Sequence, residues 1–134
     1  MVETVYARED FLGADEYIAV VRASGLNRPV DDRGRVERML AHANLILTAR
    51  QDGKLVGFAR SLTDFCFCCY LSDLAVDRAC QGQGIGKHLI EETRKQAGGA
   101  QTTTLLLSAP GALSFYRAIP MPQADNCFLY RRSA

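Results

Sequence analysis

The sequence contains no tryptophan and no apolar run near the roughly 20 residues that a membrane-spanning helix requires. Neither sign of charge dominates, because 16 lysines and arginines oppose 15 aspartates and glutamates. The net charge of +1 gives no general attraction to nucleic acid, membrane surfaces or acidic partners. The N-terminus lacks a basic region followed by an apolar stretch, so no signal peptide is predicted. These absences predict a cytoplasmic protein that binds neither nucleic acid nor membrane.

Metal-ligand patterns and disulfide frameworks are also missing. The five cysteines are odd in number, and three of them crowd into Cys66-x-Cys68-Cys69 without a second ligand cluster elsewhere. The simplest interpretation is that the thiols are reduced and that no metal is bound. Cys66 and Cys68 are predicted to lie on one face of a strand as small buried residues.

The sequence does contain the alternating periodicities of one globular domain. Its 134 residues, 48% hydrophobic and 23% charged, suffice for one core and predict a single domain over residues 1–134. Apolar alternation predicts strands over residues 2–7, 45–50, 55–62, 67–76, 103–107 and 127–131. The helical period predicts helices over residues 14–23, from a cap at Asp31 or Asp32 through residue 43, and over residues 85–97 and 112–117.

The order of these elements is β-α-α-β-β-β-α-β-α-β. It predicts an α+β fold with a mixed, mostly antiparallel central sheet. Asp52-Gly53 is a strong two-residue hairpin signal between the second and third strands. The later strand–helix–strand crossover places the fifth strand parallel to the fourth.

A glycine-rich turn lies between the strand that ends at Val76 and the helix that begins at Ile85. Gly82, Gly84 and Gly86 remove the side chains that would hold a ligand away from the main chain. Unpaired N–H groups at the helix start can then face an anion, with the positive end of the helix dipole behind them. The turn predicts a binding site for the diphosphate of a nucleotide-like cofactor.

Two common phosphate-binding motifs do not fit this turn. A P-loop requires a second glycine five residues after Gly82 and a serine or threonine after Lys87, where His88 stands. When the dinucleotide motif G-x-G-x-x-G is aligned from Gly82, Lys87 stands in place of its third glycine. When it is aligned from Gly84, Leu89 stands there.

The segment Gln81-x-x-Gly84-x-Gly86 resembles the signature of the GCN5-related N-acetyltransferase (GNAT) superfamily. Ser114-Phe115-Tyr116-Arg117 resembles the Phe-Tyr segment on the last helix of that superfamily. The resemblance covers residues 45–118 well and the two ends loosely. It implies helices on both faces of the sheet, fourth and fifth strands that splay apart, and acetyl-CoA in the gap between them.

The resemblance also implies the cofactor contacts. The free edge of the fourth strand after Asp73 would pair with the pantetheine arm, and an N–H of Leu74 or Ala75 would face the acetyl carbonyl. The positions that match cofactor contacts are Leu74, Ala75, Val76, Gln81, Gly82, Gln83, Gly84, Ile85, Gly86 and Lys87.

Two residues are candidates for catalysis. Tyr116 matches the phenol that protonates the departing thiolate of coenzyme A, although a core aromatic with its hydroxyl at the surface is the alternative. Phe115 is predicted to be the better core residue of that pair. Asp73 is a candidate base for the amine, because an acidic residue among apolar strand positions is costly unless paired or functional. A carboxylate that caps a neighbouring backbone is equally compatible with the pattern.

Three residues are candidates for acceptor binding. Asn27 and Arg28 fall in the loop between the first two helices, which lines the acceptor pocket in the superfamily, and Tyr70 borders it from a strand. Arg28 either grips a carboxylate of the acceptor or is a solvated loop residue.

The sequence therefore predicts an N-acetyltransferase that moves an acetyl group from acetyl-CoA to a primary amine of a small molecule. Direct attack within a ternary complex is the expected mechanism. A non-catalytic acyl-CoA-binding regulatory or interaction module on the same fold is the alternative. The short chain is compatible with a homodimer, and the acceptor amine stays open.

Overall fold

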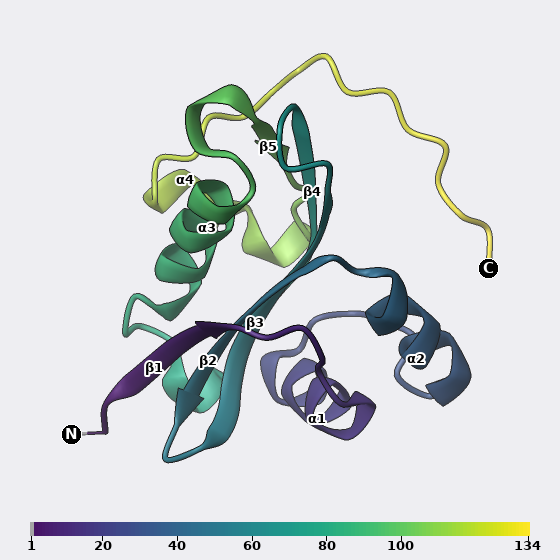
Figure 1. The fold of residues 1–134 in the computed structure, drawn as a ribbon. Coiled ribbons are helices and arrows are strands. Elements are labelled where there is room, and N and C mark those ends of the chain that lie inside the picture. The colour runs from purple at the N-terminus through teal and green to yellow at the C-terminus, as the bar shows by residue number, and fades with distance from the viewer. Residues whose placement is uncertain (1) are drawn as a thin grey trace.

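The computed structural model describes residues 2–134, which form one five-stranded sheet in the order β1-β2-β3-β4-β5 (Figure 1). Neighbouring strands from β1 to β4 are antiparallel, and β5 runs parallel to β4. The strands are β1 (Thr4–Arg8), β2 (Leu45–Gln51), β3 (Lys54–Thr63), β4 (Cys68–Val76) and β5 (Thr103–Leu105). The predicted mixed, mostly antiparallel sheet is confirmed.

Helices cover both faces of the sheet, as Figure 1 shows. The helices are α1 (Ala14–Ser24), α2 (Arg33–His42), α3 (Ile85–Gln96) and α4 (Leu113–Ala118). Short 3-10 turns are η1 (Arg78–Cys80), η2 (Gly99–Gln101) and η3 (Pro110–Ala112). One apolar cluster joins α1 and α2 to the sheet around Tyr17 and Phe58, and the other joins α3 around Leu47 and Leu89. This arrangement buries each amphipathic helix against one face.

Local signals set several of the boundaries. Asp32 rather than Asp31 caps α2, because its side chain accepts a hydrogen bond from the Arg35 N–H at 3.0 Å. The hairpin between β2 and β3 turns at Asp52 and Gly53, which both have positive φ, 51° and 79°.

A β-bulge interrupts the pairing of β3 with β4. Arg60 pairs with Asp73, but the neighbouring Ser61 pairs with Leu71, so Ser72 is an extra residue in β4. The bulge inverts the alternation of faces along the strand. Leu71 faces the α3 cluster, whereas Asp73 reaches the side of the sheet that α1 covers.

The same strand parts from β5 just before the bulge. β4 and β5 pair only from Cys68–Thr103 to Tyr70–Leu105. The rest of β4 has no strand on that side within residues 2–134. The unpaired stretch of β4 lies where the family resemblance implies that the two strands splay apart.

The predicted closing strand over residues 127–131 is not formed. Residues 122–134 make no hydrogen bond with the remainder of the described chain, and Phe128 and Tyr130 are 97% and 107% exposed. Figure 1 shows this segment leaving the body of the fold. β5 ends at Leu105 instead of residue 107, and Leu105 is 46% exposed. The outer edge of β5 is three residues long, and the C-terminal segment does not pair with it within the described chain.

The cysteine prediction is partly wrong. Cys66 and Cys68 are exposed, because Asp64 accepts hydrogen bonds from the N–H groups of both and closes a tight turn there. Cys69 and Cys80 are the buried ones. All five thiols are free, and residues 2–134 contain no group of three or more possible metal ligands.

Candidate active site

The turn between η1 and α3 forms an open cradle of backbone N–H groups. No hydrogen bond within residues 2–134 uses the N–H groups of residues 82–87. Gly82 and Gly84 have φ of 82° and 78°, values that favour glycine, and a Cβ at either would meet no atom within 4 Å. The protein's own side chains therefore leave this helix N-terminus free for an anion.

Two glutamines hold the cradle in place. Gln81 Nε2 donates to the Val76 carbonyl at 3.0 Å, which ties the turn to the end of β4. Gln83 Oε1 accepts from Gln51 Nε2 at 3.2 Å, which ties it to β2. Both side chains are anchors, so the ligand-facing groups of the cradle are its amides.

Gly86 fixes the contact between α3 and α4. A Cβ at Gly86 would lie 2.9 Å from the Phe115 ring, so only glycine lets the two helices approach this closely. Phe115 is 38% exposed and Tyr116 packs against the α3 core cluster, which reverses the predicted burial of this pair. Phe115 covers the cradle helix, and Tyr116 turns inward.

Tyr116 lies near the splayed end of the sheet. Its ring packs against the same α3 core cluster as Leu74 and Val76 of β4. Burial raises the pKa of the phenol, and the charge of Arg28 opposes that rise. The hydroxyl therefore keeps its proton at neutral pH.

Asp73 is the centre of a buried hydrogen-bonded cluster. Its side chain is 0% exposed, and it accepts from Arg60 Nε at 2.6 Å, from Arg28 Nε at 2.6 Å and from the Tyr17 hydroxyl at 2.7 Å. Burial alone would raise the pKa of Asp73, but the hydrogen bond and charge of Arg60, together with Arg28, outweigh it and lower the pKa. The carboxylate is therefore ionised and fully paired.

The bulge residue completes this cluster. The Ser72 carbonyl accepts from Arg28 Nη2 at 2.7 Å, and its hydroxyl accepts from Arg60 Nη2 at 3.0 Å. Arg28 Nη1 also donates to the Asn27 carbonyl at 2.7 Å. The α1–α2 loop is thus fastened to β4 at the point where β4 leaves β5.

Residues 8–119 match the sequence model of the Acetyltransferase (GNAT) family. The chain belongs to this family. A curated relative of this GNAT domain is the uncharacterized N-acetyltransferase ycf52 of Porphyra purpurea. It is 33% identical over 90 residues, which make up 63% of this chain and 52% of the relative. The chain spans about half the length of the curated relatives it matches.

Solved structures show the same GNAT fold. A probable acetyltransferase of unknown function, SA2161 from meticillin-resistant Staphylococcus aureus, gives a TM-score of 0.76 at 20% identity, with 98% of this chain and 99% of that chain covered. The aminoglycoside N-acetyltransferase AAC(6')-Iy in complex with CoA gives 0.72 at 15% identity, with 100% and 97% covered. At these identities the likeness establishes the fold and nothing about the acceptor.

The structure brings the predicted GNAT site residues together at the splayed end of the sheet. Leu74, Ala75 and Val76 line the part of β4 that β5 leaves unpaired. Tyr70 belongs to the last β4–β5 pair, and Lys87 is exposed beside the cradle. Asn27 contributes its backbone carbonyl to Arg28, and no hydrogen bond of its side chain is found in the described chain.

Sequence reasoning missed the roles of Tyr17 and Ser72. Tyr17 reads as an apolar helix position, and only the fold shows that its hydroxyl reaches Asp73. Ser72 gives no signal, because a bulge depends on the register of two strands rather than on one residue type. The pairing of Arg60 with Asp73 could have been predicted, since an arginine within a buried strand calls for a carboxylate partner.

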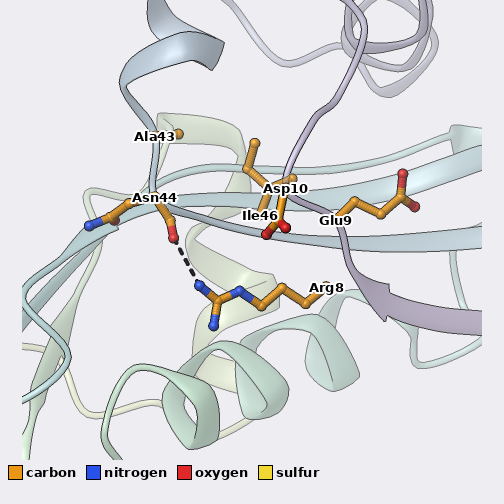
Figure 2. Close-up of a pocket in the computed structure, with 6 residues that line it drawn as sticks. All are labelled: Arg8, Glu9, Asp10, Ala43, Asn44 and Ile46. Carbon is orange, nitrogen blue, oxygen red and sulfur yellow. Dashed lines mark hydrogen bonds between the residues drawn. The ribbon is translucent and has the colours of Figure 1, made fainter.

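The pocket drawn in Figure 2 lies away from this site. A pocket of about 120 Å³ between the end of β1 and the start of β2 is lined by Arg8, Asn44 and Ile46, and Figure 2 shows Arg8 reaching the Asn44 carbonyl across it. None of the predicted site residues lines it. Within residues 2–134, no helix has the length and apolar character needed to cross a membrane.

Proposed function

We propose that this protein is an acetyl-CoA-dependent N-acetyltransferase that acts on a primary amine of a small molecule. The single observation that carries the proposal is the open cradle of residues 82–87 beside the unpaired edge of β4. Membership of the GNAT family, and a CoA complex among the structural neighbours, add support.

The residues present fit a diphosphate and a pantetheine arm. The free N–H groups of residues 82–87 suit the diphosphate, because they lie at a helix N-terminus with open space over Gly82 and Gly84. The unpaired edge of β4 from Leu74 to Val76 offers backbone groups to an extended amide chain, as an added strand would use them. Bound there, acetyl-CoA supplies an activated thioester carbon for the amine to attack.

The chain's own groups have distinct tasks in this reaction. A β4 N–H at Leu74 or Ala75 stabilises the developing oxyanion, an effect of about 3 kcal/mol for one such donor. Tyr116, whose raised pKa keeps the phenol protonated, donates a proton to the leaving sulfur.

The contacts of Asp73 favour a positioning role over that of a base. A carboxylate that is fully buried, paired with two arginines and lowered in pKa is poorly suited to take a proton from an amine. Asp73 lies beneath the α1–α2 loop, so it is suited to hold in place Arg28 and the side of the acceptor pocket that this loop lines. Water then carries the proton of the amine to solvent.

Two measurements test the proposal. Calorimetric titration with acetyl-CoA is expected to show micromolar binding, and a panel of primary amines is expected to reveal release of CoA thiol. The absence of binding at millimolar acetyl-CoA would overturn the proposal. Binding without thiol release from any amine would favour the non-catalytic acyl-CoA-binding module. The cytoplasmic location stays a prediction.

A further inference from the structure

Arg28, Arg60 and Asp73 form a buried cluster with one more positive than negative charge. Asp73 is the only carboxylate within salt-bridge distance of either arginine in residues 2–134. Tyr17 adds no negative charge, because burial and the neighbouring Asp73 raise the pKa of its phenol. The cluster therefore holds a positive surplus beneath the α1–α2 loop.

Arg28 is the member through which this surplus reaches solvent. Its side chain is 21% exposed, whereas those of Arg60 and Asp73 are 7% and 0% exposed. Its three hydrogen bonds, to Asp73, Asn27 and Ser72, leave N–H donors of the guanidinium unused. The same bonds fix the side chain, so a ligand would meet a pre-oriented cation.

The position of Arg28 relates it to the reaction site. Its guanidinium rests on the Ser72 bulge, two residues beyond Tyr70 in the last β4–β5 pair. It is also near enough to Tyr116 for its charge to act on that phenol. The unused donors therefore lie at the end of the gap where the splay begins.

We propose that Arg28 binds a carboxylate of the acceptor, so that the substrate is an amine that also carries an acid group, such as an amino acid. This inference rests on the proposed N-acetyltransferase function and names its substrate class. A guanidinium presents parallel donors that match the two oxygens of a carboxylate. A polycationic acceptor would gain no such pair and would be repelled by the surplus charge.

Matched pairs of amines test the inference directly. Phenylalanine and phenethylamine, or tryptophan and tryptamine, share the reacting amine and differ only by the carboxylate. We expect kcat/KM for the acid-bearing member to be higher by about 10-fold or more, the scale of a charge-assisted hydrogen bond. Equal rates, or faster reaction of the decarboxylated member, would overturn the inference and leave the proposed function standing. No thiol release from either member, nor from any other amine, would count against the proposed function itself.

Variants of Arg28 locate the effect. Arg28→Gln is expected to lower the ratio of kcat/KM for the acid-bearing amine to that for its decarboxylated partner by about 10-fold or more. Arg28→Lys keeps the charge beside Asp73 but loses the parallel donors of the guanidinium, so it serves as the variant if the Arg28→Gln protein fails to fold. We expect it to lose part of the preference for the acid-bearing amine over the decarboxylated one. The control is Arg22→Gln, which removes an equal charge from the exposed pair with Asp31. Equal effects of Arg22→Gln and Arg28→Gln, or no effect of either Arg28 variant, would contradict the inference.

Discussion

Asp73 illustrates what a single residue contributes to this fold. An acidic side chain in an apolar strand could be recognised from the sequence as either paired or functional, and the structure supplies three partners for it. The partners come from α1, the α1–α2 loop and β3, and only β3 is a close neighbour of β4 in the sequence. Sequence reasoning could flag the residue but could not choose its role, because that choice depends on the fold.

Replacement of Asp73 by asparagine is expected to destabilise the protein. It leaves Arg28 and Arg60 without their anion, and breaking a buried pair in this way costs about 3–5 kcal/mol. Urea denaturation at pH 7 measures the change. The control, Asp31→Asn, breaks an exposed pair with Arg22 and should cost less than about 1 kcal/mol. An Asp73→Asn protein as stable as the parent would show that the cluster adds nothing.

The same carboxylate gives stability a defined dependence on pH. Its pKa is lower in the folded protein than in the unfolded chain, where aspartate titrates near about 3.9. The unfolded state therefore binds more protons as the pH falls. The stabilisation from Asp73 is complete above the unfolded pKa and is lost as the pH drops through the folded value. Urea midpoints from pH 6 to pH 3 should fall less steeply for Asp73→Asn than for the parent.

Tyr116 can be tested apart from cofactor binding. Tyr116→Phe keeps the ring that packs against the α3 core cluster and removes the acidic proton, so kcat should fall by about 100-fold or more with little change in acetyl-CoA affinity. The raised pKa predicts that the parent enzyme keeps this proton to a higher pH than an ordinary tyrosine would. Tyr130→Phe, in the exposed C-terminal segment, is the control and should leave kcat unchanged. Equal kcat in the parent and Tyr116→Phe would remove this residue from the mechanism.

At the scale of elements, the glycine turn was the most predictable part of the molecule. Gly82 and Gly84 have the positive φ that the pattern requires, and α3 begins at Ile85 as predicted. Helices α1 and α3 and the β2–β3 hairpin were predictable for the same reason, since caps, turns and periodicity are local signals. β5 begins at Thr103 and runs parallel to β4 as predicted, but its end at Leu105 instead of residue 107 was not predictable, because the extent of an edge strand depends on what packs outside it.

A matched pair of glycine variants tests the cradle as an element. Gly84→Ala places a methyl group in the open space over the turn and forces a side chain to φ of 78°. Gly99→Ala, at the other end of α3, imposes a similar strain at φ of 63° with equally open surroundings. Both should lose about 1–2 kcal/mol of stability. Calorimetry should show weaker acetyl-CoA binding for Gly84→Ala alone, and equal affinities would exclude the cradle as the binding site.

At the scale of the whole molecule, the C-terminal segment, residues 122–134, is the part that makes no hydrogen bond with the remainder of the described chain. The strand predicted over residues 127–131 is not formed, and this segment pairs with no strand edge within residues 2–134. Each copy of the chain thus presents a strand-like segment and the unpaired outer edge of β5. Two copies can satisfy each other reciprocally in a closed two-fold arrangement. This gives the predicted homodimer a specific form.

Light scattering after size exclusion tests this form of dimer. The parent protein is expected at twice the monomer mass, and a chain truncated after Met121 is expected as a folded monomer. The truncation should leave circular dichroism of the core unchanged, because residues 122–134 make no hydrogen bonds to it. Phe128→Ser tests the contact without shortening the chain, and Arg132→Ser is its control. A monomeric parent, or a truncated chain that still dimerises, would contradict the arrangement.

The extra residue at Ser72 has a consequence for how such a site can arise. Upstream of it, odd-numbered positions of β4 point to α3, and downstream of it the even-numbered ones do. Deleting Ser72 would leave a regular ladder in which Asp73 still pairs with Arg60, but it would remove the carbonyl that accepts from Arg28 and the hydroxyl that accepts from Arg60. One inserted amino acid thus supplies the contacts that attach Arg28 to a strand which is otherwise a plain antiparallel ribbon.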